Sequence, residues 1–234
     1  MSIRPLAMIG FDADDTLWQN EQYYRLTEDH FKSLLADFAD VDHISERLLN
    51  AEKRNLGHYG FGIKGFTLSM IETALEVTEG RAPGRVIGDI LAIGRELLSH
   101  PVETLPHARE TLEKLAGDYF LVMITKGDLF DQERKLAQSG LGDIFDAVEI
   151  VSDKSATTYR RVFSRNGESP DRAMMVGNSL KSDVVPAIAA GAWGVFVPHE
   201  LTWILEQVEK PMEAPRFREL THLGELPDLL ASLQ

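Results

Sequence analysis

Short continuous apolar runs recur along the chain, and most of them end where polar or acidic residues begin. A short apolar run bounded by polar or turn residues is typical of a strand that is buried on both faces of a parallel sheet. The segments with this pattern are Leu6–Phe11, Tyr119–Thr125, Ala147–Val151, Ala173–Gly177 and Trp193–Val197, and a shorter strand is expected near Phe217–Leu220.

Segments with helical periodicity separate these runs. They are Ala108–Leu115, Leu129–Ser139, Ala156–Ser164, Ser182–Ala190 and, near the end of the chain, Leu226–Leu233. Glycine follows two of them directly, as Gly140 and Gly191, which is a common way for a helix to end. The alternation of strands and helices predicts the α/β fold class, with a Rossmann-like, doubly wound parallel sheet as the core.

One long region, residues 19–100, breaks the alternation and contains no convincing strand pattern. Its helical patterns are Tyr23–Phe38, Ile44–Asn55, Phe66–Val77 and Val86–Leu98, and the glycine-rich segment Gly57–Gly62 separates two of them. An insertion of this length can form a lobe of its own. We therefore expect a core domain formed by residues 1–18 and 101–234 and an all-helical domain formed by residues 19–100.

The composition is that of a folded protein with a strongly acidic balance. The 234 residues carry a formal net charge of −13, which disfavours nucleic acid and anionic membrane surfaces as partners. Cysteine is absent, which excludes disulfides and favours a reducing, cytoplasmic setting. Neither a secretory signal nor a membrane span is expected, because the longest apolar stretch, Val184–Pro198, contains proline and glycine and is shorter than the roughly 20 residues of a span. The oligomeric state has no signal in the sequence.

Polar residues gather directly after several of the predicted strands. The clusters are Asp12–Leu17, Thr125–Asp128, Ser152–Lys154 and Gly177–Asp183. Because ligands bind beyond the carboxyl ends of the strands in open parallel sheets, these clusters are expected to contribute to one site.

The residue types in these clusters suit phosphoryl transfer. Asp12 and Asp14 lie two residues apart, and crowded carboxylates need a cation, for which hard oxygen ligands favour Mg²⁺. Thr125 offers a hydroxyl, and Lys154 offers a point charge for a phosphate oxygen. A carboxylate can also be the nucleophile and form an aspartyl-phosphate.

At these positions the chain resembles the haloacid dehalogenase-like hydrolase superfamily. The family's first motif is Asp-x-Asp-x-(Thr/Val), the second a Ser or Thr, the third a Lys, and the fourth Gly-Asp-Ser followed by a further Asp. The matching residues, in motif order, are Asp12, Asp14 and Thr16; Thr125; Lys154; and Gly177, Ser179 and Asp183. The motifs occur in the family's order, each after a predicted strand, and the resemblance covers residues 6–198.

The resemblance implies a role for each motif. Asp12 is expected to be the nucleophile, and Asp14 to protonate the leaving alcohol and then deprotonate the attacking water. Mg²⁺ is the implied cofactor, and for Asp14 the backbone carbonyl is the implied metal ligand. The expected phosphate-binding residues are Thr125, Lys126 and Lys154, and the expected metal ligands are Asp12, Asp14, Asn178 and Asp183.

Asn178 departs from the family's pattern, since many relatives have aspartate there. An amide oxygen still coordinates a hard cation, but it brings no charge, so a lower metal affinity is expected. Asp183 is the other candidate for a direct contact with the metal, or it acts through water. The choice between Asn178 and Asp183 stays open at this level.

The resemblance also narrows the reaction. Dehalogenases of the family lack the second aspartate, so Asp14 favours hydrolysis of a phosphate ester. The helical insertion lies between motifs one and two, where the family inserts its first type of cap, and residues 127–153 are too few for the larger alternative cap. A cap that closes over the site and excludes water implies a small phosphorylated metabolite as substrate, with no single compound indicated.

Other functions remain as alternatives. A phosphomutase or a phosphonate hydrolase of the same superfamily would use the same site, and the latter needs an imine-forming lysine on the cap. Lys32, Lys53 and Lys64 lie in the helical insertion, none in a recognisable context. A non-catalytic ligand-binding relative is a further reading, against which the intact Asp12 and Asp14 argue.

Three other features of the sequence are given structural readings or left open. Gly60–Gly65 fits Gly-x-Gly-x-x-Gly, but no buried strand precedes it, so we expect a loop and not a dinucleotide site. Lys64 and Tyr59 contact substrate or face solvent, and Trp18 lines the substrate cavity or packs at the start of the linker. The seven histidines show no metal-ligand spacing and are interpreted as structural.

Overall fold

The computed structural model describes residues 5–233, and they form two compact units, the core and the helical unit. The core consists of the residues up to Glu21, Val102–Lys126 and those from Gln132 onward, and the helical unit of Gln22–Pro101 and Gly127–Asp131. The predicted helical domain, 19–100, did not include the short second segment. An ion pair between Lys64 Nζ and Asp128 Oδ2 (2.8 Å) ties this segment to the rest of the helical unit.

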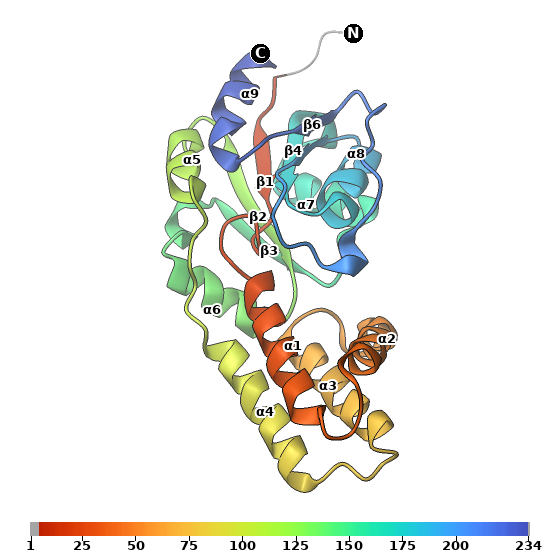
Figure 1. Ribbon diagram of the computed structural model, residues 1–234. Coiled ribbons are helices and arrows are strands. Elements are labelled where there is room, and N and C mark those ends of the chain that lie inside the picture. Colours follow the sequence, from red (N-terminus) through yellow and green to blue (C-terminus); the bar gives the residue numbers. More distant parts are fainter. Residues whose placement is uncertain (1–4, 234) are drawn as a thin grey trace. The chain divides into compact units, whose positions relative to one another are not determined.

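The core is built on a parallel sheet. Its strands are β1 (Met8–Phe11), β2 (Phe120–Lys126), β3 (Ala147–Val151), β4 (Ala173–Gly177), β5 (Trp193–Phe196) and β6 (Phe217–Glu219). They lie in the order β3-β2-β1-β4-β5-β6, and all of these neighbours pair in parallel (Figure 1). The chain builds outward from β1 on one side and then on the other, so the predicted α/β class and its doubly wound, Rossmann-like sheet are confirmed.

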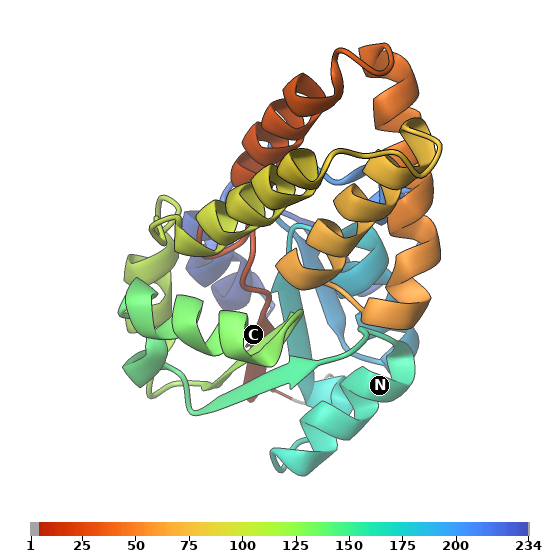
Figure 2. The ribbon, with the colours of Figure 1, turned by 90° about the horizontal axis from the view of Figure 1, so that it is seen from below.

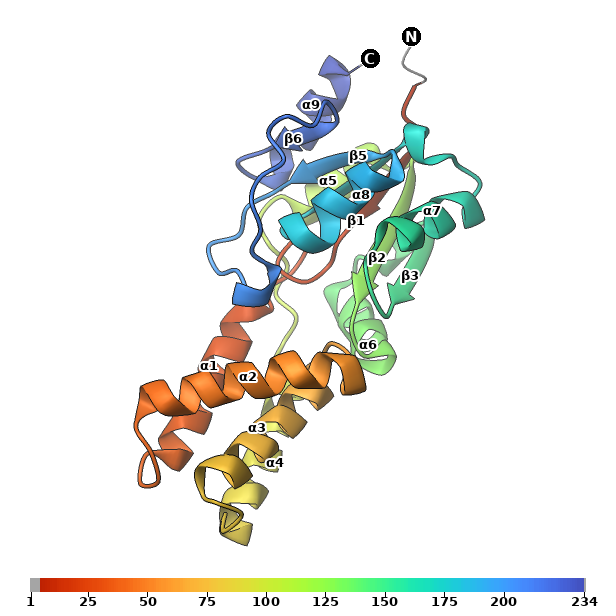
Figure 3. The same cartoon turned by 90° about the vertical axis from the view of Figure 1, so that its right-hand side faces the viewer.

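Helices cover both faces of this sheet. They are α5 (Ala108–Leu115), α6 (Leu129–Ser139), α7 (Ala156–Arg165), α8 (Val185–Ala190) and α9 (Leu226–Ser232). Ile9 and Phe11 belong to the hydrophobic cluster of α5 and α9, whereas Met8 belongs to that of α7 and α8, which lie beside each other in Figure 3. Successive side chains of a strand point to opposite faces, and both faces are covered here. The central strands β1 and β4 are therefore buried and apolar along their whole length, which is why they appear as continuous apolar runs.

The predicted helix Ser182–Ala190 is present, but its first part is a π-helical turn and only the rest is α-helix. A wide turn, Leu180–Val184, precedes α8, and the Ser179 hydroxyl accepts a hydrogen bond from the backbone amide of Ser182 (2.9 Å). Pro186 lies in the first turn of α8, where a residue without an amide hydrogen is tolerated. The wide turn belongs to the segment that holds the fourth motif, so its shape decides where those side chains point.

The helical unit contains α1 (Glu21–Leu35), α2 (Val41–Tyr59), α3 (Ile63–Val77) and α4 (Gly84–Ser99), coloured red to yellow in Figure 2. Phe31, Leu48, Phe66 and Ile90 are among the buried side chains of its own hydrophobic cluster. None of the helices within residues 5–233 is long and apolar enough to cross a membrane.

The glycine-rich segment of this unit is shorter than predicted. Helix α2 continues through Gly57 to Tyr59, and only Gly60–Gly62 separates it from α3. Gly60 and Gly62 have φ angles of 72° and 117°, which glycine adopts without the steric cost of a Cβ. The second half of the Gly-x-Gly-x-x-Gly match is therefore helical, and the loop expected there covers only its first half.

Candidate active site

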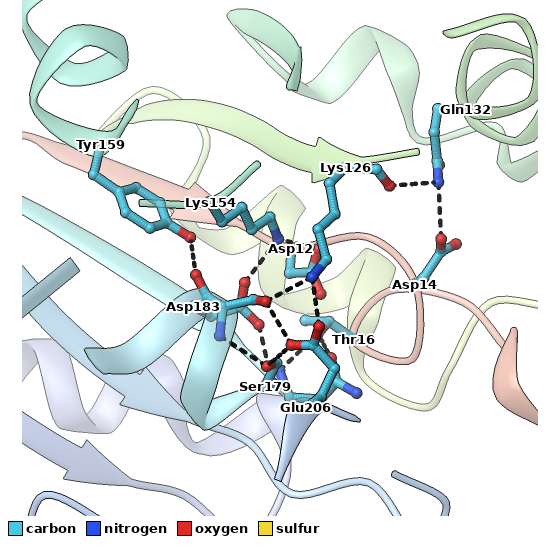
Figure 4. A network of polar contacts seen from close by, with 12 residues as sticks. Asp12, Asp14, Thr16, Lys126, Gln132, Lys154, Tyr159, Ser179, Asp183 and Glu206 are labelled. Atoms are coloured by element: carbon cyan, nitrogen blue, oxygen red, sulfur yellow. Dashed lines mark hydrogen bonds and ion pairs between the residues drawn. The ribbon is translucent and has the colours of Figure 1, made fainter. Parts of the chain in front are cut away.

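The carboxyl ends of four strands place the predicted residues at one edge of the sheet. Asp12 follows β1, Thr125 and Lys126 end β2, Lys154 comes after β3, and Asn178 follows β4. β1 lies between β2 and β4, at the point where the order of strands reverses. In doubly wound sheets this switch point is where ligands bind. Figure 4 shows the side chains that meet there.

Lys154 joins two carboxylates at this edge. Its Nζ donates to Asp12 Oδ1 (2.5 Å) and to Asp183 Oδ1 (2.7 Å), and all three side chains are buried. The second Asp183 oxygen accepts from the backbone amide of Ser179 (2.9 Å). Gly177 is the residue that makes room for this arrangement, because a Cβ at that position would lie 2.2 Å from Asp183 Oδ2.

The pKa values of both Asp12 and Lys154 are raised, for different reasons. Burial, reinforced by the charge of Asp183 and opposed by Lys154, raises the pKa of Asp12 to about 7. For Lys154, burial acts to lower the pKa, but the charges of Asp12 and Asp183 outweigh it and the pKa is raised. One ammonium thus serves two carboxylates, and the site has a surplus of negative charge that a further cation would relieve.

The Asp14 carboxylate lies among three side-chain donors. Trp18 Nε1 (2.7 Å) and Lys135 Nζ (2.7 Å) donate to Oδ1, and Gln132 Nε2 (2.8 Å) donates to Oδ2. Burial acts to raise the pKa of Asp14, but the charge and hydrogen bond of Lys135, with the other two hydrogen bonds, outweigh it and lower the pKa. Trp18 is fully buried in the hydrophobic cluster of the core, which agrees with the expectation of packing at the start of the linker, and its indole is in addition a specific partner of Asp14.

Oxygen atoms converge beside Asp12. A terminal atom of the Asn178 amide lies 3.2 Å from Asp12 Oδ2, 3.2 Å from the backbone carbonyl oxygen of Asp14 and 3.3 Å from Thr16 Oγ1. With its nitrogen in that place, Asn178 donates to these oxygens; turned over, it presents a further oxygen to the same space. Adjacent ligands of an octahedral Mg²⁺ lie roughly 3 Å apart at metal–oxygen distances of about 2.1 Å. This oxygen set therefore fits a hard divalent cation.

The metal donors available here are mostly neutral. Across residues 5–233, no group of three or more His, Asp or Glu side chains is arranged to hold a metal. The convergent set instead consists of one carboxylate, one backbone carbonyl and one amide, from Asp12, Asp14 and Asn178. Mg²⁺ is commonly held by one or two carboxylates and keeps several waters. Asp183 is not among the atoms that converge on the Asn178 amide, and each of its oxygens accepts a hydrogen bond, one from Lys154 and one from the Ser179 amide.

Lys126 joins the same polar network through other partners. Its Nζ donates to Glu206 Oε1 (2.5 Å) and to Ser182 Oγ (2.7 Å), while the Ser179 and Ser182 hydroxyls donate to Glu206 Oε2. Burial acts to raise the pKa of Glu206, but Lys126 and the two hydroxyls outweigh it and lower the pKa. The structure therefore places Lys126 against the carboxylate of Glu206. Thr125, one residue earlier, is buried.

Three residues of these networks were not predicted from the sequence. Gln132 and Lys135 lie three residues apart on α6, so they share one helix face, a spacing that was visible in the segment after Thr125. Glu206 comes from a short 3₁₀ turn, Ile204–Glu206, in a segment without periodicity, and no pattern pointed to it. In the helical unit, Lys64 is paired with Asp128.

The fold and the site together define a class of protein. Its members have a Rossmann-like α/β core in which a lysine bridges two aspartates at the switch point of the sheet. Within that class, the chain belongs to the haloacid dehalogenase-like hydrolase family, whose model matches residues 7–191. The resemblance seen in the four motifs is thereby confirmed at the level of the family.

Individual relatives agree with this assignment. Glyceraldehyde 3-phosphate phosphatase from Methanothermobacter thermautotrophicus is 25% identical over 209 residues, which cover 84% of this chain and 88% of that protein. A haloacid dehalogenase-like family hydrolase from Xanthomonas campestris has a structure with 44% identity and a TM-score of 0.88, over 97% of this chain and 91% of that one.

Dehalogenases share the fold as well. The L-2-haloacid dehalogenase from Xanthobacter autotrophicus, solved with chloropropionic acid covalently bound, gives a TM-score of 0.69 at 20% identity, over 98% of this chain and 100% of that one. At this identity the likeness concerns the fold alone. The fold is therefore shared by proteins named as phosphatases and as dehalogenases, and the reaction has to be argued from the site.

Proposed function

We propose that this protein is a Mg²⁺-dependent phosphatase that hydrolyses a small phosphorylated metabolite through an aspartyl-phosphate on Asp12. The observation that carries the proposal is the second carboxylate, Asp14, which is half-buried two residues after Asp12 and is held by three donors. Cleavage of a carbon–halogen bond releases a stable halide and needs no acid, whereas an alkoxide leaving group does. The named phosphatase among the relatives supports the same choice.

The reaction takes two steps. First, a carboxylate oxygen of Asp12 forms a bond to phosphorus while the bond from phosphorus to the ester oxygen breaks, and Asp14 gives its proton to the departing oxygen. Next, a water oxygen forms a bond to phosphorus while the bond to Asp12 breaks, and Asp14 accepts a proton from that water. The products are the free alcohol and inorganic phosphate, and both aspartates return to their initial states.

Positive charge comes from two sources in this scheme. Lys154 lies on Asp12, where it favours the ionised, nucleophilic carboxylate, and it is placed to contact the phosphoryl oxygens. Asp12, the Asp14 carbonyl and Asn178 would hold Mg²⁺, since their oxygens converge. When bound, the metal neutralises charge on the phosphoryl oxygens and orients them. Of the two fourth-motif candidates, Asn178 is the proposed direct ligand, because Asp183 is taken up by Lys154 and the Ser179 amide.

Lys126 is proposed to act at the phosphate only through the backbone of its loop. Its ammonium is neutralised by Glu206, so a phosphate contact would require that pair to separate. Thr125, whose side chain is buried at the end of β2, is proposed as the hydroxyl donor to the phosphoryl group.

The helical unit is proposed as the cap of the family, which favours small substrates. Lysines of this unit bear on the alternative of a phosphonate hydrolase. Burial acts to lower the pKa of Lys32, but Glu28 and Asp29 outweigh it and raise the pKa, and Lys64 is paired with Asp128. An imine-forming lysine needs the reverse, a lowered pKa and a free amine. Neither lysine therefore favours that alternative.

Phosphate release from a panel of phosphorylated sugars, nucleotides and organic acids, together with a generic aryl phosphate, tests the proposal. We expect Mg²⁺-dependent release that EDTA abolishes and that Asp12→Asn reduces by at least about 10³-fold. Asp143→Asn, an exposed aspartate of the core, is the matched control and should retain full activity. Metal-dependent turnover that persists in pure Asp12→Asn protein would refute the nucleophile. Chloride release from 2-chloropropionate, with no phosphate released from any ester, would make the protein a dehalogenase.

A further inference from the structure

The side chain of Asp14 has more hydrogen-bond partners than a metal ligand needs if it binds the metal through its backbone carbonyl alone. Its carboxylate accepts hydrogen bonds from Trp18, Gln132 and Lys135. These donors are deeply buried, with 0%, 2% and 7% of their surfaces exposed. Burying a lysine and a glutamine costs free energy unless their polar groups are satisfied, so such a set is retained where it serves a purpose.

Helix α6 delivers two of these donors as a unit. Gln132 and Lys135 lie three residues apart on the same face of α6, and both reach the same carboxylate (Figure 4 shows Gln132 above Asp14). Each also makes a second bond that fixes its direction. Gln132 Nε2 donates to the Lys126 carbonyl (3.3 Å), and Lys135 Nζ donates to Asn20 Oδ1 (3.0 Å).

The hydrogen bonds leave a single position on Asp14 for chemistry. An ionised carboxylate offers about four lone-pair sites, two on each oxygen. Trp18 and Lys135 occupy both sites on Oδ1, and Gln132 occupies one site on Oδ2. The remaining site on Oδ2 is the one from which a proton can pass to a leaving oxygen or be received from water.

We propose that Lys135 and Gln132 are positioning residues that hold the Asp14 carboxylate so that its Oδ2 exchanges the proton with the leaving oxygen and then with the attacking water. This inference rests on the proposed phosphatase function. Neither residue touches the phosphoryl group in this scheme. Removal of either residue should therefore slow the hydrolysis of a substrate more, the more its leaving group needs a proton.

Two aryl phosphates of similar shape separate these effects. Nitrophenolate is a stable anion that leaves without a proton, whereas methylphenolate is more basic and benefits from one. The measurement is the first-turnover rate of phenol release from 4-nitrophenyl phosphate and from 4-methylphenyl phosphate, with Mg²⁺ present. The first turnover reports the formation of the aspartyl-phosphate and excludes the later attack of water.

The variants form a thermodynamic cycle. They are Lys135→Met, Asp14→Asn and the double variant, with Gln132→Leu as a second probe that leaves Lys135 in place. We expect Lys135→Met to slow the hydrolysis of 4-methylphenyl phosphate at least about tenfold more than that of 4-nitrophenyl phosphate. This is part of the roughly 10²–10⁴-fold rate increase that general acid catalysis provides. In the Asp14→Asn background, Lys135→Met should change that ratio no further, because the residue acts through Asp14. Lys210→Met, which breaks an exposed ion pair with Glu219, should leave the ratio unchanged.

The outcomes distinguish this inference from the proposed function. Equal losses on both esters, or a further change of the ratio in the double variant, would overturn the positioning role while the phosphatase stands. If wild-type protein releases phosphate from neither of these esters nor from any member of the metabolite panel, the proposed function and this inference both fail. Should Lys135→Met not fold, as judged by circular dichroism, Gln132→Leu decides the matter with the same ratio, and an unchanged ratio there overturns the inference.

Discussion

Lys154 is the positive charge that two buried carboxylates share, those of Asp12 and Asp183. Its side chain is 1% exposed, and it contacts Asp12 and Asp183 at 2.5 and 2.7 Å. Removing one partner of a buried ion pair leaves an uncompensated charge, which costs far more than the pair itself contributes. The stability of the metal-free protein therefore depends on this residue.

We expect Lys154→Met to lower the free energy of unfolding by about 3–5 kcal/mol in the absence of divalent metal. Mg²⁺ should restore part of this loss, since a cation beside Asp12 replaces part of the missing charge. Urea unfolding with EDTA and with Mg²⁺ measures both effects. Lys210→Met, which removes one partner of an exposed pair, should change stability by less than about 1 kcal/mol. Equal losses in the two variants would contradict this account of Lys154.

At the scale of elements, turns and loops complete the site that the strands begin. The wide turn Leu180–Val184 carries Asp183, and the 3₁₀ turn Ile204–Glu206 carries Glu206. Glu206 links the two turns to the end of β2, because its carboxylate accepts from Lys126 and from the Ser179 and Ser182 hydroxyls. A single carboxylate thus holds together three segments that are distant in sequence.

Substitution of this carboxylate should give a loss of stability that depends on pH. Glu206→Gln keeps the shape but not the charge, and we expect a loss of about 1–3 kcal/mol near neutral pH. The fold lowers the pKa of Glu206 below its ordinary 4.5. The unfolded chain therefore takes up the proton first as the pH falls, so the stabilisation is present above the ordinary pKa and is lost as the pH falls through the folded value.

The corresponding measurement is urea unfolding of wild type and Glu206→Gln at about pH 6 and about pH 3.5. The difference between the two proteins should shrink at the lower pH. A difference that stays constant or grows would mean that the charge of Glu206 contributes nothing and that the side chain acts by packing alone.

At the scale of the whole molecule, the net charge of −13 does not describe the site. There the negative charges of Asp12 and Asp183 are offset by Lys154, and that of Glu206 by Lys126. Asn178 lies where many relatives have an acid, which spares the metal-free protein one more charge beside Asp12. The neutral side chain of Asn178 should lower the affinity for a divalent cation, because negatively charged ligands bind metals more strongly.

Asn178→Asp should therefore tighten Mg²⁺ binding by roughly tenfold or more and destabilise the metal-free protein. A titration of the thermal midpoint with Mg²⁺ measures both, because a ligand that binds only the folded state raises the midpoint with its concentration. Gln138→Glu adds the same charge at an exposed position of α6 and should leave the titration unchanged. Weaker Mg²⁺ binding in Asn178→Asp would exclude residue 178 as a direct ligand.

Local patterns predicted much of the fold because each pattern is a consequence of the burial of a single element. β3 and β4 begin and end where the predicted strands do, and β4, which is buried along its whole length, has no polar position. The predictions failed where geometry depends on neighbours. Gly57 reads as a break but is accommodated within α2, and the helix that ends at Ala190 begins with a π-helical turn that the pattern did not distinguish from an α-helix.

The site divides in the same way. Asp12, Asp14, Thr125 and Lys154 were recognisable because a family motif specifies each of them by residue type and order, and their roles remain predictions. The partners of Asp14 were beyond reach, because Gln132 and Lys135 lie 118 and 121 residues away along the chain. Sequence alone determined the elements, the family and the chemically active residue types, through short-range periodicity and spacing. Only the tertiary structure decided which charges face one another, because contacts between distant segments arise from packing that no local pattern encodes.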